Sequence, residues 1–214
     1  MNNDVLVIGL TGPSGAGKTQ VVDLLTADKH IVSIDMDKLA REVTAVGSDC
    51  LKKLAKTFSD TILNDDGSLN RKKLAEIAFA SPQKTQMLND ITHPAIIAKT
   101  DRLLTQYRED PFVDAVILDA PLLLESGMDS ICDKVIAVLA DFETRVSRIC
   151  ARDGISEEAA KLRLARQHTD TFYADKADAV VYNNGDKDML AVNTAPIIEN
   201  IKEWLQIAFE KTNH

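Results

Sequence analysis

Short, nearly continuous apolar runs recur along the chain and alternate with longer segments whose apolar residues return every three or four positions. Runs rich in Val and Ile indicate parallel strands that are covered on both faces, whereas the three-to-four spacing indicates amphipathic helices. The strands are expected at 5–9, 31–34, 115–119, 134–139 and 179–182. The helices are expected at about 17–27, 38–44, 50–58, 71–80, 84–107, 143–152, 156–167 and 187–209.

The spacing between the expected strands is uneven. The first two are joined by a crossover of about twenty residues, which is normal for one βαβ unit, but about eighty mostly helical residues separate the second from the third. We therefore expect a helical insertion at 39–108 and a core made of 1–38 and 109–214. A shorter segment at about 141–176, between the fourth and fifth expected strands, predicts a helical lid. The fold class that follows is α/β, with a five-stranded parallel sheet.

The clearest motif lies directly after the first expected strand, where residues 12–19 read Gly-Pro-Ser-Gly-Ala-Gly-Lys-Thr. This matches G-x-x-x-x-G-K-[ST], the phosphate-binding loop, and a helical pattern follows it as the motif requires. The side chain of Lys18 is expected to reach the β- and γ-phosphates of ATP, and the hydroxyl of Thr19 to bind Mg²⁺. A coincidental glycine-rich turn is the alternative, and the flanking strand and helix disfavour it. The predicted nucleotide-binding residues are Gly12, Ser14, Gly15, Ala16, Gly17, Lys18, Thr19 and Gln20.

Carboxylates follow the second and third expected strands, at the sheet edge where α/β proteins bind ligands. Of Asp35 and Asp37, one could accept the proton of an alcohol while the other orders Mg²⁺ or its waters. The alternative for this pair is a helix N-cap. Asp119 is a further candidate for the metal, or else a turn residue at the end of its strand.

Motifs that the sequence lacks disfavour one class of nucleotide-binding protein, the GTPases. Neither Asn-Lys-x-Asp nor Thr-Lys-x-Asp, which read guanine in GTPases, occurs in the chain. A small phosphate-loop chain with helical flaps favours a kinase that closes over a small acceptor, because closure keeps water from competing for the phosphoryl group. A nucleoside or nucleoside-monophosphate kinase and an ATP-binding regulatory module remain alternatives.

Several motifs in order along residues 5–185 resemble those of dephospho-coenzyme A kinases. Besides the phosphate loop, they are Asp-x-Asp-x-x-x-Arg at 35–41, His-Pro at 93–94, Pro-Leu-Leu-x-Glu at 121–125, Arg-x-x-x-Arg-Asp-Gly at 148–154 and Asn-Asn-Gly at 183–185. Each motif alone is weak, but the ordered combination is specific. The resemblance implies a three-layer P-loop kinase fold with a helical acceptor-binding insertion and a short helical lid.

The resemblance also implies an activity, the transfer of the ATP γ-phosphoryl group to the ribose 3′-hydroxyl of dephospho-coenzyme A in the last step of coenzyme A biosynthesis. Asp37 is then expected to receive or orient the hydroxyl proton, and Asp35 to lie in the outer shell of the metal. Arg41, one helical turn after Asp37, could hold the substrate pyrophosphate. The remaining residues expected to bind the acceptor are His93, Leu122 and Glu125. The alternatives are a simple surface arginine for Arg41 and a packing histidine for His93.

The lid and the end of the last strand carry the remaining candidates. By the resemblance, Arg148 is expected to contact phosphate as a catalytic group alongside Lys18 and Asp37, and Arg163 to stack on adenine. Asn183 and Asn184 are expected to contact the adenine edge. A salt-bridged, solvated helix face is the alternative for the arginines, and a turn before Gly185 is the alternative for the asparagines.

The amino-acid composition indicates which kinds of partner the chain binds. With 33 acidic and 25 basic residues the net charge is −8, which disfavours broad nucleic-acid binding. Three widely spaced cysteines disfavour a disulfide framework or a thiolate metal site. No apolar run is long enough to cross a bilayer, and no secretory signal is expected. We therefore expect a cytoplasmic enzyme, monomeric or weakly homo-oligomeric, that binds ATP, Mg²⁺ and a small acceptor.

Overall fold

The computed structural model describes residues 5–212 and divides the chain into two compact units. One unit runs up to Asp35 and resumes at Tyr107, and it contains the sheet. The other spans Met36–Gln106 and is helical. Within residues 5–212, no helix is both long enough and apolar enough to cross a membrane.

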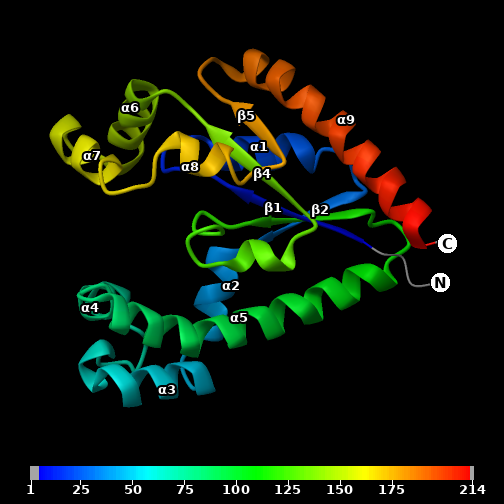
Figure 1. Cartoon of the computed structure of the whole chain (residues 1–214). Coiled ribbons are helices and arrows are strands. Elements are labelled where there is room, and N and C mark those ends of the chain that lie inside the picture. Colours follow the sequence, from blue (N-terminus) through cyan, green and yellow to red (C-terminus); the bar gives the residue numbers. More distant parts are fainter. Residues whose placement is uncertain (1–4, 213–214) are drawn as a thin grey trace. The chain divides into compact units, whose positions relative to one another are not determined.

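A parallel sheet of five strands, in the order β2-β3-β1-β4-β5, forms the centre of the first unit (Figure 1). Every strand pair is parallel, so the carboxyl ends of all the strands lie at one edge. The predicted five-stranded parallel sheet is confirmed. Its strands are β1 (Leu6–Thr11), β2 (Ile31–Asp35), β3 (Ala115–Asp119), β4 (Lys134–Leu139) and β5 (Ala179–Tyr182).

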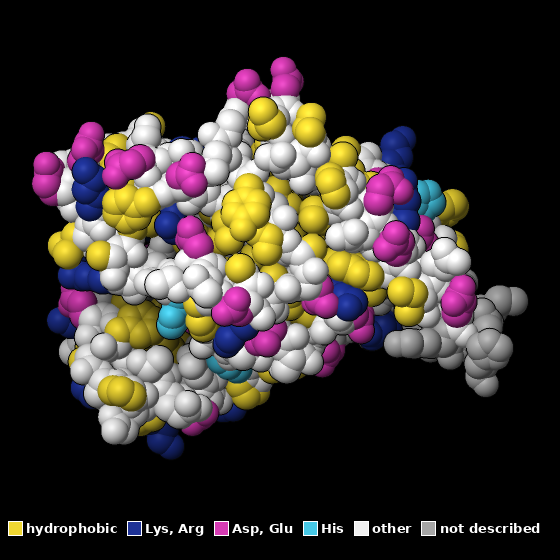
Figure 2. Space-filling model, turned by 45° about the horizontal axis from the view of Figure 1, so that its top comes forward, with side chains coloured by type: hydrophobic (Ala, Val, Ile, Leu, Met, Phe, Trp, Pro, Cys, Tyr) yellow, Lys and Arg dark blue, Asp and Glu magenta, His cyan; other side chains and the backbone are white. Residues whose placement is uncertain are grey.

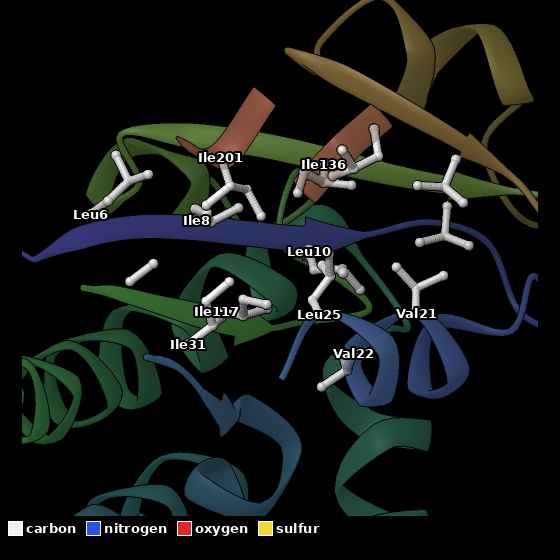
Figure 3. Packing of buried hydrophobic residues seen from close by; sticks show 14 of the residues in the cluster. Leu6, Ile8, Leu10, Val21, Val22, Leu25, Ile31, Ile117, Ile136 and Ile201 are labelled. Atoms are coloured by element: carbon white, nitrogen blue, oxygen red, sulfur yellow. The ribbon is translucent and has the colours of Figure 1, made fainter. Parts of the chain in front are cut away.

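Helices α1 (Lys18–Leu25) and α9 (Lys187–Thr212) pack on one face of the sheet. Ile8 and Leu10 of β1 point into this layer, where they meet Val21 of α1 and Ile201 of α9 (Figure 3). Side chains alternate along a strand, so Gly9 faces the other side of the sheet. A Cβ atom on Gly9 would collide with Leu123, which shows that the segment after β3 covers that face closely.

The remaining helices of this unit come from the lid region and its surroundings. Helices α6 (Phe142–Asp153) and α7 (Glu157–Leu164) share a small core of their own, and α8 (Asp170–Ala174) packs on β4. The 3₁₀ helix η2 (Met128–Ile131) precedes β4. Helix α8 was not predicted, because five residues are too few to show a helical period.

The helical unit is built from α2 (Met36–Val43), α3 (Asp49–Phe58), η1 (Asp60–Ile62), α4 (Arg71–Ala78) and most of α5 (Pro82–Glu109). It has its own core, made by Leu54, Phe58, Ile62, Leu74 and Ala78 with their apolar neighbours. The starts of α3 and α4 are defined by side-chain caps: Ser48 accepts from the Leu51 N–H and Asn70 from the Lys73 N–H. The caps and the core together account for helices that are individually short.

Replacement of Ile117 by alanine tests the role of the sheet core. Ile117 is fully buried on β3, so Ile117→Ala should lower the free energy of unfolding by about 2–5 kcal/mol. Phe112→Ala removes a larger side chain that is 70% exposed just before the same strand, and it should change stability by less than about 0.5 kcal/mol. Urea denaturation of both variants measures the difference, and equal losses would contradict the core assignment.

Candidate active site

The phosphate loop connects the end of β1 to the start of α1. Its glycines Gly12, Gly15 and Gly17 have φ angles of 141°, 81° and 89°, a region that side-chain-bearing residues rarely adopt. They also pack closely, because a Cβ atom would collide with the Val138 carbonyl oxygen at Gly12 and with the Asn183 amide at Gly17. Both the conformation and the packing therefore require glycine at these positions.

The side chain of Lys18 folds back over the loop. Its Nζ donates to the carbonyl oxygens of Gly12, at 2.8 Å, and of Pro13, at 3.3 Å. Thr19 and Gln20 follow in the first turn of α1, and both are exposed. An anion within the loop would thus meet the ammonium group, the loop N–H groups and the positive end of the helix dipole together.

Arg148 of α6 approaches the loop from its carbonyl side. Its guanidinium donates to the carbonyl oxygen of Asn183 at 2.9 Å, and to those of Gly15 and Ala16 at 3.4 Å each. In a planar trans peptide the C=O and N–H point in opposite directions. By holding the carbonyls of Gly15 and Ala16, Arg148 therefore directs the N–H groups of the next residues away from itself, which is the orientation that a phosphate cradle needs.

Asn183, after β5, supports the loop from the same direction. Its side chain is 1% exposed and its Nδ2 donates to the Ala16 carbonyl oxygen at 2.9 Å. Asn184 instead accepts a hydrogen bond from the N–H of Asp141, just before α6. The amide of Asn183 thus faces the phosphate loop in this structure, and the expected contact of both residues with adenine stays a prediction.

Gln167, beyond the end of α7, contacts the loop as well. Its Oε1 accepts a hydrogen bond from the Ser14 N–H at 3.0 Å. Local sequence does not predict this contact, because a hydrogen bond across 153 positions leaves no trace in it. Three further segments of the same unit therefore meet at the phosphate loop: α6, the connection after α7, and the turn after β5.

Arg145 lies one turn before Arg148 but in a different environment. It is 7% exposed, and its Nη2 lies 3.2 Å from Asp170 Oδ1 at the start of α8. Its backbone packs against Gly15, where a Cβ atom would come within 2.8 Å of the Arg145 carbonyl oxygen. Arg145 thus belongs to the packing between α6, α8 and the loop.

Glu125 and Leu122 lie on the segment after β3. The carboxylate of Glu125 accepts a hydrogen bond of 2.7 Å from the hydroxyl of Tyr173 on α8, whereas Leu122 is exposed. Burial, the hydrogen bond to Glu125 and the charge of Glu125 all raise the pKa of Tyr173, so its hydroxyl keeps the proton that it donates. The segment that carries Leu122 is therefore tied to α8.

Arg163 makes an ion pair on the lid. Its Nη1 lies 2.7 Å from Asp153 Oδ2, and Arg152 donates hydrogen bonds to both oxygens of the same carboxylate. The Arg152 guanidinium and, to a smaller extent, that of Arg163 lower the pKa of Asp153 to about 2. In this structure Arg163 is part of an exposed salt-bridged face, and its stacking on adenine stays a prediction.

Two carboxylates lie side by side at the carboxyl edge of the sheet. Asp35 at the end of β2 pairs in register with Asp119 at the end of β3, and Asp119 also pairs with Leu10 of β1, just before the phosphate loop. The described residues contain no cluster of three or more His, Cys, Asp or Glu side chains that could hold a metal by itself. Mg²⁺ commonly uses one or two carboxylates together with substrate phosphates, and the residues here fit that arrangement.

The helical unit carries the remaining predicted residues. Asp37 lies in the first turn of α2 and Arg41 in its last turn, and both are exposed. His93 lies within α5, next to Pro94. Burial lowers the pKa of His93, against an opposing effect of Asp90, so the imidazole is neutral at pH 7 and able both to donate and to accept a hydrogen bond.

A glycine-rich phosphate loop after the central strand of a parallel sheet, with arginines packed against it, defines a P-loop kinase. The dephospho-CoA kinase family model matches residues 6–188. A dephospho-CoA kinase of Corynebacterium efficiens is 39% identical over 197 residues, which cover 92% of this chain and 98% of that protein. The chain belongs to the dephospho-CoA kinase family.

Solved structures agree with this assignment. A crystal structure from Thermus thermophilus superimposes with a TM-score of 0.76 at 28% identity and covers 91% of this chain and 97% of that one. A dephospho-CoA kinase from Campylobacter jejuni gives a TM-score of 0.56 at 26% identity, with 91% of this chain and 96% of that one covered.

The face of the molecule in Figure 2 shows acidic and basic side chains interspersed, without one continuous basic patch.

Removal of the Arg148 guanidinium tests its contribution to the loop. Arg148→Met breaks several hydrogen bonds to backbone carbonyls, so stability should fall by about 2–3 kcal/mol and ATP should bind about 10- to 100-fold more weakly. Arg166→Met removes an exposed arginine and should change neither quantity measurably. Thermal unfolding and ATP titration provide the readouts. Unchanged melting and unchanged ATP affinity in Arg148→Met would contradict the support of the loop by Arg148.

Proposed function

We propose that the chain transfers the γ-phosphoryl group of ATP to the ribose 3′-hydroxyl of dephospho-CoA, giving CoA and ADP in the last step of CoA biosynthesis. The observation that carries this proposal is the phosphate loop, whose glycines adopt left-handed conformations and whose carbonyls are bound by Arg148 and Asn183. Membership of the dephospho-CoA kinase family supports the choice of acceptor.

On the ATP side, the loop N–H groups bind the phosphate oxygens, and Lys18 moves from the Gly12 and Pro13 carbonyls to the β- and γ-phosphates. The Ser14 N–H, which Gln167 now occupies, becomes available to a phosphate oxygen when the glutamine withdraws. Arg148 acts as a positioning residue through the loop and contacts the phosphates once ATP is bound. Arg163, Asn183 and Asn184 contribute to the adenine site.

The Thr19 hydroxyl would hold Mg²⁺ directly, and Asp35 and Asp119 would hold its waters. The bound ion would supply neutralisation of negative charge on the phosphate oxygens. Register pairing of Asp35 with Asp119 supports this assignment, because it brings two oxygen donors together beside the strand that leads into the phosphate loop.

On the acceptor side, Asp37 accepts the proton of the 3′-hydroxyl while the hydroxyl oxygen attacks the γ-phosphorus. The bond between the γ-phosphorus and the bridging oxygen breaks, and ADP leaves with the electron pair of that bond. Arg41 binds the acceptor diphosphate, His93 contacts its nucleoside, and Leu122 and Glu125 complete the acceptor site. Most of the rate enhancement comes from alignment and charge stabilisation, since phosphoryl transfer asks little covalent chemistry of the protein.

We place the reaction in the cytoplasm, with both substrates small molecules and the enzyme a monomer or weak homo-oligomer. The free thiols Cys50, Cys132 and Cys150 are compatible with a reducing compartment. Burial, with smaller effects of Asp129 and Asp133, raises the pKa of Cys132 to about 12, so this thiol is unreactive.

Asp37→Asn separates catalysis from a role in helix stability. Asp37 lies within the first turn of α2, and the substitution keeps its size while removing only a favourable charge at the helix N-terminus, so stability should change by less than about 1 kcal/mol. It removes the proton acceptor, so single-turnover phosphoryl transfer should fall by roughly 10²–10⁴-fold while ATP affinity stays the same.

Asp49→Asn is the matched control, because Asp49 is an exposed carboxylate in the first turn of α3 in the same unit. It should leave transfer unchanged. If the Asp37→Asn variant transfers phosphate within a few-fold of the unmodified enzyme, Asp37 is not the catalytic carboxylate, and Asp35 becomes the next residue to replace.

A further inference from the structure

Two arginines of the helical unit come together from distant positions in the sequence. Arg71 is the first residue of α4, and its Nη2 donates a hydrogen bond of 2.8 Å to the Thr44 hydroxyl, just beyond the end of α2. Thr44 is buried, and its hydroxyl in turn donates to the Ala40 carbonyl oxygen. The Arg71 guanidinium is thereby anchored at the end of α2, in whose last turn Arg41 lies.

Arg71 is exposed as a residue, and the charge of Arg41 acts on its guanidinium. Partial burial of the guanidinium lowers its pKa most, the like charge of Arg41 lowers it further, and Asp37 acts in the opposite direction. Within residues 5–212, neither guanidinium lies within ion-pair distance of a carboxylate. Glu42, the acid next to Arg41 in sequence, is paired with Lys99. Two guanidinium groups that repel each other become stabilising when an anion binds between them.

The position of Arg71 does not help its own helix. The first turn of α4 contains no acidic residue and begins Arg71-Lys72-Lys73, and cations at a helix N-terminus oppose the helix dipole. The hydrogen bond to Thr44 uses one of the five N–H donors of the guanidinium, so others remain for a ligand. A planar guanidinium binds phosphate oxygens in a bidentate manner, and two of them match two adjacent phosphates.

We propose that Arg71 and Arg41 together clamp the diphosphate of the acceptor and thereby orient its ribose toward Asp37. This inference rests on the proposed function, because it takes dephospho-CoA as the acceptor. Arg41 lies about 6 Å along α2 from Asp37, one helical turn. The 3′-hydroxyl and the 5′-diphosphate belong to the same ribose, only a few bonds apart, so one acceptor spans both sites.

The clamp makes the diphosphate a determinant of acceptor choice. An acceptor without it forgoes the contacts that Arg41 and Arg71 make, while its nucleoside and 3′-hydroxyl still reach the helical unit. Arg71 is then a binding and positioning residue and takes no part in proton transfer. Its loss should affect the KM of the acceptor more than kcat.

The test compares Arg71→Gln with Lys72→Gln, an exposed cation one position along the same helix. Arg71→Gln should raise the KM for dephospho-CoA about 10- to 100-fold, with the KM for ATP within about twofold of the unmodified enzyme. Lys72→Gln should leave both constants within about threefold. Arg71→Lys keeps the charge but not the planar fork, so it should restore only part of the affinity.

Two further experiments distinguish a binding role of Arg71 from a purely structural one: Thr44→Val and a double-substitution cycle. Thr44→Val removes the anchor of Arg71 but keeps its charge, and it should raise the acceptor KM less than Arg71→Gln does. Because both arginines bind one ligand group, the effects of Arg41→Gln and Arg71→Gln on kcat/KM should be non-additive. Thermal unfolding checks that each variant is folded.

The proposal is overturned if folded Arg71→Gln keeps the acceptor KM of the unmodified enzyme, or if Lys72→Gln raises it equally. A rise in the KM for ATP as large as that for the acceptor would also contradict it. If the unmodified enzyme transfers no phosphate to dephospho-CoA, the proposed function itself fails. If the unmodified enzyme is active on dephospho-CoA and Arg71→Gln has the same acceptor KM, only the diphosphate clamp is disproved and the proposed function stands.

Discussion

The backbone conformation of residues 12–17 is the constraint on which the nucleotide-binding unit depends. A phosphate cradle needs several N–H groups directed to one point, and at Gly12, Gly15 and Gly17 the chain achieves this with φ angles that other residues rarely adopt. Such a conformation is unfavourable unless the surroundings hold it. The structure supplies that support on the carbonyl side of the loop through Arg148 and Asn183.

The groups that support the phosphate loop come from elements that lie far apart in the sequence. The parallel sheet brings the ends of β1, β4 and β5 to one edge, so the turn after β5 and the helix after β4 both reach the loop. The Gly12 backbone packs against Val138 of β4, and Gly15 packs against Arg145 of α6. The sheet order thus determines the surroundings of the loop as well as its position.

Local sequence was sufficient for the sheet and the phosphate loop, because buried parallel strands produce continuous apolar runs and the loop needs glycine at fixed spacing. It was insufficient wherever a side chain takes its role from a distant partner. Examples are the burial of Arg145, the pairing of Arg163 with Asp153 and the contact of Gln167 with Ser14. Arg71 is another, since it is followed by two ordinary surface lysines and its significance comes from Thr44 and Arg41.

Transfer of phosphate from ATP to the 3′-hydroxyl of dephospho-CoA is the central claim, and identification of the product tests it most directly. The purified enzyme is incubated with Mg²⁺, γ-labelled ATP and either dephospho-CoA or its 3′-deoxy analogue, and the products are examined by phosphorus NMR. The account predicts a labelled monoester at the 3′ position with the first acceptor and none with the second. Label transferred to both acceptors, or only to water, would contradict it.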